Sequence, residues 1–214
     1  MKKTSKGIFI VGTDTGVGKT YIACSLANAL NKRKISLAVM KPIASGDRKD
    51  AESLIRASGS KEKINSVNPI FLKYPLAPYV SAKLEKKSVN LKKVWAQFKK
   101  LGNKYDFLIV EGIGGLMAPI KSDYFVIDMI RKFNLPALVV ARPSLGTLNH
   151  TLLTVEKLRR EKIKIIGIVL SGGRKLSLAE KTNPTILKEL TGLPVTEVYK
   201  NKELNLGKNP WLIK

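Results

Sequence analysis

The sequence is poor in the residue types that build disulfide-stabilised folds and histidine-based metal sites. Its 214 residues include one cysteine, Cys24, and one histidine, His150. A single cysteine excludes an intramolecular disulfide and any metal site made of several cysteines. A single histidine excludes paired histidine ligands. We expect Cys24 to be a core residue on the helix after the phosphate loop rather than a nucleophile, and His150 to be a surface or packing residue rather than an acid–base catalyst.

Long apolar runs are also missing, since no stretch approaches the ~20 residues that span a bilayer. The N-terminus imitates a signal peptide only briefly, because Asp14 follows the short apolar run 8–11. The composition, 44% hydrophobic and 26% charged, is that of a globular protein. We therefore expect a single domain over residues 1–214, cytoplasmic and without membrane association.

Acidic residues are scarce, with 16 against 39 basic ones and a net charge of +23. Such an excess ordinarily suggests a polyanionic partner. Only eight of the basic residues are arginine, however, the side chain best suited to phosphate and base recognition. In the lysine-rich stretch 83–104, the lysines fall mostly off an apolar helical face made by Leu91, Val94, Trp95, Phe98 and Leu101. We interpret the lysines as solvated surface charge and expect no specific nucleic-acid partner.

Short apolar runs alternate with longer amphipathic segments along the whole chain. The runs are continuous, as in strands buried on both faces of a parallel sheet. They lie at 8–11, 37–40, 107–110, 137–141, 165–170 and 195–198, and helices are expected at 19–33, 50–58, 90–102, 123–133, 147–161 and 183–191. Asn90, Asp123, Thr147 and Asn183 are the expected N-caps, with Pro184 at the first helical position. This alternation predicts an α/β fold, doubly wound around a mostly parallel sheet.

The first strand is followed by a glycine-rich phosphate-binding loop, GTDTGVGKT, at 12–20. Glycines allow successive backbone N–H groups to face one anion at a helix N-terminus. Lys19 supplies a cation for the β- and γ-phosphates, and the Thr20 hydroxyl is a Mg²⁺ ligand in such loops. Five residues separate the first glycine from Gly-Lys-Thr, one more than in the general pattern. The loop predicts a P-loop nucleotide site.

Charged residues follow the second and third strands, where ligands gather in such sheets. Lys41 leaves the second strand before Pro42 and is expected to point across the rim of the site, although a solvated lysine fits the position equally. Asp50 either faces Mg²⁺ or is an ordinary acid at a helix start. Glu111 ends the third strand at the Walker B position, with a capping carboxylate as the alternative. After the fourth strand, the helix start near Gly146 offers a second anion site.

Taken together, these loops resemble those of the ATP-dependent dethiobiotin synthetases. The resemblance rests on GTDTGVGKT at 12–20, KPIASG at 41–46, Asp50-Ala51, VEGIGG at 110–115, and Leu145-Gly146 with Asn149-His150. Weaker support comes from Asn68-Pro69, 75–82 and TGLPV at 191–195. The five-residue spacing in the phosphate loop is the one this family uses. The likeness runs in order from about residue 7 to residue 198.

The resemblance implies that CO2 and ATP close a ureido ring on 7,8-diaminononanoate, through a carbamate and a carbamic–phosphoric anhydride. It implies catalytic roles for Lys19, Lys41, Thr15 and Ser45, and a homodimer in which the partner's helix start holds the distant substrate carboxylate. The implied metal ligands for Mg²⁺ are Thr20, Asp50 and Glu111. The implied nucleotide residues are Gly16, Val17, Gly18, Lys19, Thr20, Tyr21, Asp50, Glu111, Gly112, Ile113, Gly114, Ser171 and Gly172, and the implied substrate residues are Thr15, Lys41, Ser45, Leu145, Gly146, Thr147 and Asn149.

Two departures from the family pattern concern the nucleobase. Ser171-Gly172-Gly173 stands where many relatives have Asn-Asp, whose amide reads adenine. The expected nucleotide is therefore ATP or another nucleoside triphosphate. The tail after Val198 differs as well, with Pro210-Trp211-Leu212 only near its end. The alternative functions are another P-loop ATPase, of the amide-synthase or partition type, and a basic nucleic-acid-binding protein. Against the first, the chain is too short for an added glutaminase domain and has no second lysine at 12–17. Against the second, the chain has few arginines and no exposed-looking aromatic platforms.

Overall fold

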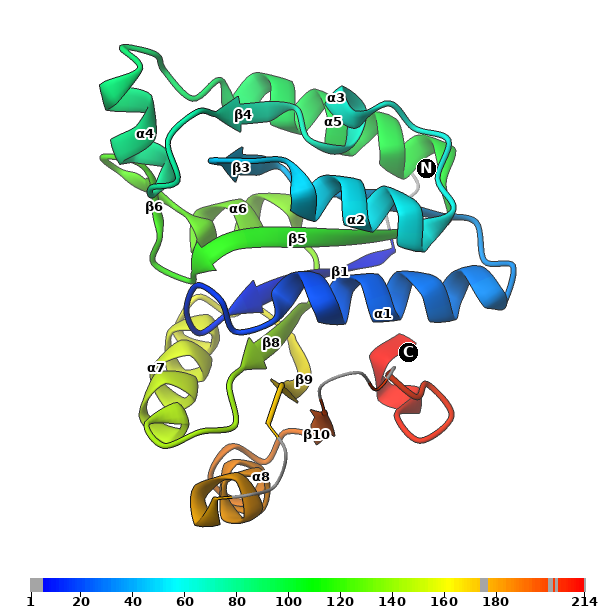
Figure 1. Ribbon diagram of the computed structural model, residues 1–214, viewed down its shortest axis with the longest axis vertical. Coiled ribbons are helices and arrows are strands. Elements are labelled where there is room, and N and C mark those ends of the chain that lie inside the picture. The colour runs from blue at the N-terminus through cyan, green and yellow to red at the C-terminus, as the bar shows by residue number, and fades with distance from the viewer. Residues whose placement is uncertain (1–5, 174–176, 200–201, 203, 214) are drawn as a thin grey trace.

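A six-stranded parallel sheet forms the centre of the molecule (Figure 1). The computed structural model describes residues 6–173, 177–199, 202 and 204–213. In spatial order the sheet runs β10-β9-β8-β1-β5-β2. Its strands are β1 (Gly7–Gly12), β2 (Leu37–Met40), β5 (Phe107–Gly115), β8 (Ala137–Ala141), β9 (Ile165–Ser171) and β10 (Val195–Val198). From β1 the chain crosses to the edge strand β2, returns to β5 beside β1, and then adds β8, β9 and β10 on the other side, so β1 lies at the switch point where such folds bind ligands.

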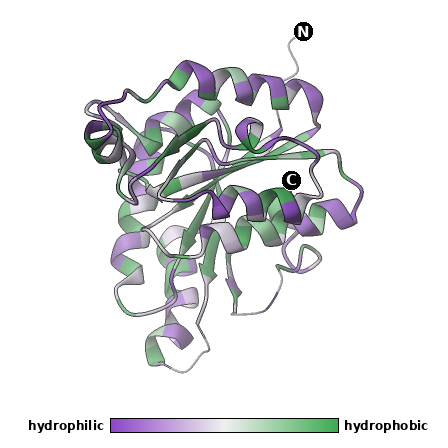
Figure 2. Ribbon diagram, turned by 45° about the horizontal axis from the view of Figure 1, so that its top comes forward, coloured by the Kyte–Doolittle hydropathy of each residue, from purple (hydrophilic) through white to green (hydrophobic). Residues whose placement is uncertain are grey.

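Helices cover both faces of the sheet. They are α1 (Lys19–Lys32), α2 (Lys49–Ser58), α5 (Leu91–Lys104), α6 (Val126–Phe133), α7 (Thr147–Arg160) and α8 (Leu178–Thr191). Alternate residues of β1 enter opposite cores: Phe9 packs with α5 to α8, and Ile10 packs with α1 and α2. Figure 2 accordingly shows apolar strands inside and hydrophilic outer helix surfaces. The doubly wound α/β prediction is confirmed. Among the described residues, no helix has the length and apolar character needed to cross a membrane.

Several small elements were not predicted. A parallel pair, β3 (Ile43–Ser45) and β4 (Ile70–Leu72), and an antiparallel pair, β6 (Pro119–Lys121) and β7 (Tyr124–Phe125), flank the main sheet. The others are α3 (Ile64–Val67), α4 (Pro78–Leu84) and the 3₁₀ turn η1 (Pro210–Ile213). In Figure 1, α4 and β6 lie at the same end of the molecule as the phosphate loop. These elements build one wall of the cavity described below.

Three of the four expected helix caps are wrong. Asn90 is confirmed, since its side chain accepts from the backbone N–H of Lys93. Asp123 is not the cap of α6, because the next two residues pair in β7 and the helix begins after Phe125. Thr147 is the first residue of α7, and Gly146 precedes it at φ 89°.

The eighth helix begins earlier than expected. Ser177 caps α8 by accepting from the backbone N–H of Glu180, so Pro184 lies inside the helix rather than at its first position. The Asn183 side chain does not cap the helix. It is buried and donates to the backbone carbonyl of Pro143, 2.8 Å away, which ties α8 to the loop after β8.

Candidate functional site

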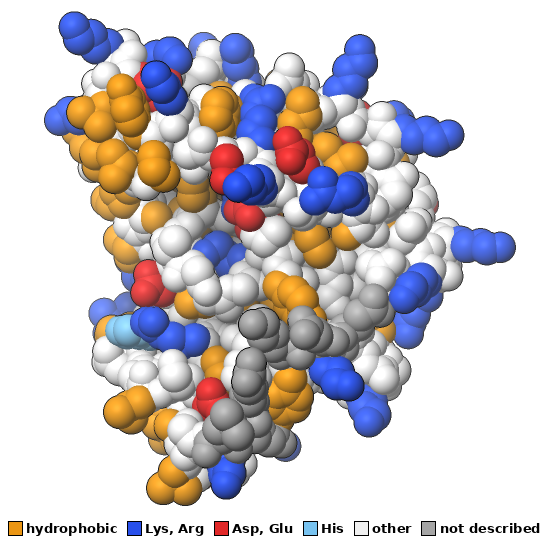
Figure 3. Space-filling view, viewed as in Figure 1, with side chains coloured by type: hydrophobic (Ala, Val, Ile, Leu, Met, Phe, Trp, Pro, Cys, Tyr) orange, Lys and Arg blue, Asp and Glu red, His pale blue; other side chains and the backbone are white. Residues whose placement is uncertain are grey.

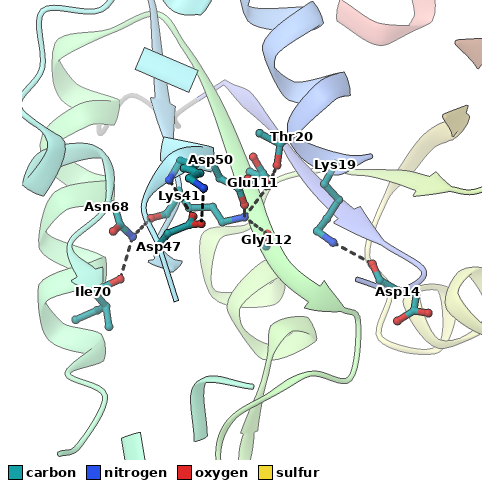
Figure 4. Close-up of polar contacts among 11 residues, drawn as sticks. Asp14, Lys19, Thr20, Lys41, Asp47, Asp50, Asn68, Ile70, Glu111 and Gly112 are labelled. Atoms are coloured by element: carbon teal, nitrogen blue, oxygen red, sulfur yellow. Dashed lines mark hydrogen bonds and ion pairs between the residues drawn. The ribbon is translucent and has the colours of Figure 1, made fainter. Parts of the chain in front are cut away.

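The carboxyl ends of β1, β2 and β5 bring the predicted charged residues together (Figure 4). They open into a cavity of about 1080 Å³ that continues between the β6 region and α7. Of the expected site residues, the cavity is lined by Thr15, Gly16, Gly18, Lys19, Thr20, Lys41, Ser45, Asp50, Glu111, Ile113 and Gly114. Residues from four separate segments of the sequence therefore share one space.

The phosphate loop has the backbone that an anion nest requires. Gly16 and Gly18 adopt positive φ angles of 73° and 95°, a region that other residues rarely occupy. The Lys19 side chain is buried, and its ammonium donates to the backbone carbonyl of Asp14, 3.0 Å away. Burial, together with the neighbouring charge of Lys41, lowers the pKa of Lys19 to about 8. An anionic ligand beside such a buried lysine would stabilise its charged form.

Lys41 lies deeper than expected. The sequence predicts an ammonium that points across the rim, but the side chain is only 4% exposed. The ammonium is 2.6 Å from Glu111 Oε1 and 2.7 Å from Asp50 Oδ2, and it also donates to the Gly112 carbonyl at 3.2 Å. The Thr20 hydroxyl donates to the same Glu111 oxygen at 2.7 Å. β5 extends to Gly115, so Glu111 lies inside the strand rather than at its end. A solvated lysine and a capping glutamate are both excluded by this geometry.

The opposite charges in this cluster stabilise one another. Burial alone lowers the pKa of Lys41, but the carboxylates of Glu111 and Asp50 outweigh burial and the net effect raises it. Burial raises the pKa of Asp50, and here the Lys41 ammonium reverses the direction, so the net pKa is lowered. Lys41 and Asp50 are therefore both charged at neutral pH.

The same two carboxylates, with the Thr20 hydroxyl, also suit a magnesium ion. Glu111 is fully buried, and among the described residues its second oxygen, Oε2, has no hydrogen-bond partner. With Asp50 and the Thr20 hydroxyl it makes a set of hard oxygen donors. The described residues hold no group of three or more Asp, Glu, His or Cys side chains that binds a metal by itself. Mg²⁺ characteristically uses one or two carboxylates plus phosphate oxygens and waters, so the residues present fit this ion together with a nucleotide.

Other expected residues lie outside the cavity lining. Val17 is buried beneath the phosphate loop, and the Gly112 carbonyl faces Lys41. The remaining expected substrate residues lie at the start of α7: Leu145 is 88% exposed, Thr147 is buried, and Gly146 and Asn149 are exposed. They do not line this chain's own cavity.

The expected nucleobase residues sit beside the phosphate loop. A Cβ added to Gly18 would lie 2.9 Å from the Ser171 Cβ and closer still to its hydroxyl, so Ser171 packs against the loop. Gly172 donates its backbone N–H to Val198 at 3.0 Å. The Tyr21 hydroxyl donates to the carbonyl of Lys202, which links α1 to the C-terminal segment.

Several cavity residues are not indicated by the sequence patterns. One wall is largely apolar and is formed by residues 75–78 and 116–118, and α7 contributes His150, Leu153, Thr154 and Lys157. His150 is thus a cavity residue, with Nδ1 3.3 Å from the Arg142 guanidinium. The segment 75–82 contributes to the family resemblance, and this is the sequence feature that could have indicated residues 75–78 as part of the wall. Periodicity gives no such signal for the short segment 116–118.

Asn68 holds the backbone of Lys41 in place. This residue is fully buried, and its amide donates to the backbone carbonyls of Lys41 at 2.8 Å and Ile70 at 2.9 Å. It therefore joins the end of β2 to β4. Asn68 belongs to an Asn-Pro pair that contributes to the family resemblance, but nothing in the sequence indicates this contact.

The chain is similar to known proteins over nearly its whole length. A family model described as an AAA domain matches residues 6–204. An ATP-dependent dethiobiotin synthetase BioD of Endomicrobium trichonymphae is 48% identical over 98% of this chain and 99% of its own length. The protein of the same name from Bacillus licheniformis is 42% identical over 90% of this chain and 85% of its own, and that of Methanocaldococcus jannaschii is 41% identical over 92% and 94%.

Solved structures support the fold alone. MinD of Pyrococcus horikoshii, solved with Mg-ADP, has a TM-score of 0.55 at 18% identity, covering 97% of this chain and 85% of its own. FtsY of Thermotoga maritima has a TM-score of 0.56 at 16% identity, covering 96% of this chain and 66% of its own. Both are similar to this chain in how the central sheet and its helices are arranged.

Proposed function

The chain belongs to the family of ATP-dependent dethiobiotin synthetases, and from this membership we propose how its residues carry out the reaction. The enzyme is an ATP-dependent ligase of biotin biosynthesis. It joins 7,8-diaminononanoate and CO2 into a ureido ring and releases ADP and phosphate. The observation that carries the assignment of roles is the meeting of Lys41, Glu111, Asp50 and Thr20 next to the phosphate loop.

Charge compensation is the main task of these residues. One substrate amine loses a proton and bonds to CO2 as a carbamate, whose oxygen then bonds to the γ-phosphorus while ADP leaves. Both reactants are anions and repel one another, so the ammonium groups of Lys19 and Lys41 stabilise the charge as they come together. The second amine then bonds to the carbonyl carbon, phosphate leaves, and this amine loses its proton. The protein forms no covalent bond, and its contribution is positioning and electrostatics.

Thr15 and Ser45 are proposed to hold the reacting end of the diamine. Both line the cavity, and the buried Ser45 hydroxyl has no hydrogen-bond partner among the described residues. The largely apolar wall at 75–78 and 116–118 suits the aliphatic chain of the substrate.

Thr20, Asp50 and Glu111 are proposed to hold Mg²⁺ with the nucleotide. When bound, this ion supplies positive charge for the β- and γ-phosphate oxygens. The unpartnered Glu111 oxygen supports the proposal, since a buried carboxylate oxygen is costly unless it is coordinated or hydrogen-bonded.

We propose that the nucleobase is read loosely. Ser171 and Gly172 offer no side-chain amide beside the loop, so ATP is the expected substrate but other triphosphates are expected to compete. Competition among ATP, CTP and GTP tests this, and a strong preference for ATP would contradict it.

A homodimer is proposed, with the start of α7 reaching the partner's site. The support is that two large apolar side chains are exposed: Leu145 just before α7, at 88%, and Leu153 on α7, at 64%. Large exposed apolar side chains are common at subunit interfaces. Sedimentation of the wild type and of Leu153→Glu tests it, and a monomeric wild type would contradict it. We propose a cytoplasmic location because the reaction consumes ATP.

The decisive experiment is incubation with 7,8-diaminononanoate, bicarbonate, Mg²⁺ and ATP, followed by mass detection of the ureido product. The variant Lys41→Gln should keep the fold at reduced stability, because two carboxylates lose their cation. It should lose at least about 10²-fold in kcat, because a cation that stabilises the transition state is removed. Near-normal turnover in this variant would remove Lys41 from the mechanism.

A further inference from the structure

The Lys41 ammonium lies where two carboxylates converge. It is within 2.7 Å of oxygens from both Asp50 and Glu111, and the Thr20 hydroxyl shares the Glu111 oxygen. These are the three side chains to which the proposed function assigns the metal. In Figure 4 the lysine enters this group from the side of Asn68, and Lys19 lies on the far side.

Two cations bound to the same two carboxylates repel one another. A Mg²⁺ ion binds carboxylate oxygens at about 2.1 Å with strict octahedral geometry. The Lys41 ammonium donates to Glu111 Oε1 at 2.6 Å and to Asp50 Oδ2 at 2.7 Å, and it lies between the two carboxylates. Glu111 Oε2 has no hydrogen-bond partner among the described residues, but a metal bound there by the same carboxylates lies close to the ammonium, and repulsion between the two cations in a buried site opposes joint binding. The ion pairs of Lys41 and a metal on both carboxylates are therefore alternatives.

We propose that Lys41 and the metal ion exchange places: the ammonium holds Asp50 and Glu111 together, and binding of the metal with the nucleotide releases it toward the reacting anions. The inference deepens the proposed function, because it takes the metal ligands from that proposal. No bond to carbon or hydrogen changes, since the lysine keeps its proton and only its ionic partners differ. The exchange makes the catalytic cation available only when the phosphates are in place.

The backbone of Lys41 is built to stay fixed while the side chain moves. Its N–H donates to the Val67 carbonyl at 2.9 Å, and its carbonyl accepts from the Asn68 amide at 2.8 Å. Pro42 follows directly and restricts the chain further. The exchange therefore requires rotation of the lysine side chain alone, without a shift of β2.

Metal binding without nucleotide tests the exchange. Binding of Mn²⁺, followed by loss of the free-ion electron paramagnetic resonance signal, is compared among the wild type, Lys41→Met and Lys49→Met. Lys49 is the matched control, since its side chain is 83% exposed and it neighbours Asp50 on the same helix. Lys41→Met should bind Mn²⁺ at least about tenfold more tightly than the other two, because two carboxylates lose their competing cation. Equal affinity in all three proteins would overturn the proposal.

A double variant separates this effect from a general change of charge. Adding Asp50→Asn to Lys41→Met removes one of the two carboxylates and should abolish the gain in Mn²⁺ affinity. A gain that persists in the double variant contradicts the proposed exchange at this pair.

The wild type provides a readout that does not depend on the variants folding. In a crystal structure with Mg²⁺ and a non-hydrolysable ATP analogue, Lys41 Nζ should lie more than about 4 Å from both carboxylate oxygens. If it keeps both contacts beside a bound metal, the exchange is wrong even when the enzyme makes product. Failure of the wild type to make product would instead refute the proposed function, and the Mn²⁺ comparison would still stand.

Discussion

Individual glycines decide whether the phosphate loop can form. Gly18 has a positive φ and packs on Ser171, and Gly16 has a positive φ with open space around it. We expect Gly18→Ala to abolish detectable nucleotide binding, because the added methyl group meets Ser171 as well as the strained backbone. Gly16→Ala should only weaken binding, by the ~1–2 kcal/mol that a left-handed alanine costs. Titration with a fluorescent ATP analogue measures both, and equal losses would contradict this account.

Lys19 makes nucleotide affinity depend on pH. Its pKa falls to about 8 in the folded chain from an ordinary 10.5, chiefly through burial. As pH rises through 8 the ammonium loses its proton, so affinity for the triphosphate should decline between about pH 8 and 9.5. In the unfolded chain the lysine keeps that proton to higher pH, so this group's contribution to the free energy of unfolding rises with pH from 8 to 10.5.

The matched control for this pH dependence is Lys19→Arg. Arginine stays charged throughout this range, so its affinity should not change with pH even if it is lower at pH 7. Calorimetric titration of both proteins at several pH values provides the measurement. A wild-type affinity that is flat from pH 7 to 9.5 would show that Lys19 stays charged in the folded protein.

At the scale of elements, the C-terminal segment is part of the core. Leu204, Leu206 and Leu212 are buried against α1 and its side of the sheet, and Trp211 contacts Gly167 of β9. We expect Leu212→Ala to lower the free energy of unfolding by about 2–5 kcal/mol, the range for a fully buried leucine. Leu190→Ala on α8 is the control, since Leu190 is 55% exposed and should change stability by less than about 0.5 kcal/mol. Denaturant unfolding measures the free energy of unfolding of both variants. Equal changes in the two would show that the C-terminal segment is peripheral to the core.

Elements with a strong periodic signal are predictable, and the short ones are not. Continuous apolar runs locate β2, β8 and β10 at their observed bounds. The pairs β3–β4 and β6–β7 have strands of two or three residues, which are too short for any period. The sequence predicts a start of α8 at Asn183 because Asn-Pro is a frequent helix beginning, whereas Ser177 is the cap and Asn183 makes a tertiary contact.

The site divides in the same way. The phosphate-loop motif indicates Lys19 and Thr20 directly, whereas Asp50 and Glu111 are candidates for which the sequence also allows a helix-start acid and a capping carboxylate. The direction of the Lys41 side chain is not predictable, since it depends on carboxylates 9 and 70 residues away. Asn68 and the α7 wall likewise enter the site only through folding.

At the scale of the whole molecule, lysines supply most of the net charge of +23. Lysines and arginines are spread around the face seen in Figure 3, while apolar side chains gather over α4 at its upper left. A distributed field attracts polyanions without fixing their orientation, and lysines carry most of it. Recognition of a particular nucleic acid sequence is therefore not expected from this surface.

Salt dependence tests this account of the charge. We expect weak binding to duplex DNA at about 50 mM salt, of equal strength for unrelated sequences. Its affinity should fall by at least about 10³-fold by 200 mM, because counterion release is less favourable at higher salt. Fluorescence anisotropy with two labelled duplexes of different sequence provides the measurement, and turnover at both salt concentrations is the control. Turnover should change far less than DNA binding, because Lys19 and Lys41 are buried and so are poorly screened. Binding that survives 200 mM salt and distinguishes the two duplexes would mean that the basic surface has a recognition function of its own.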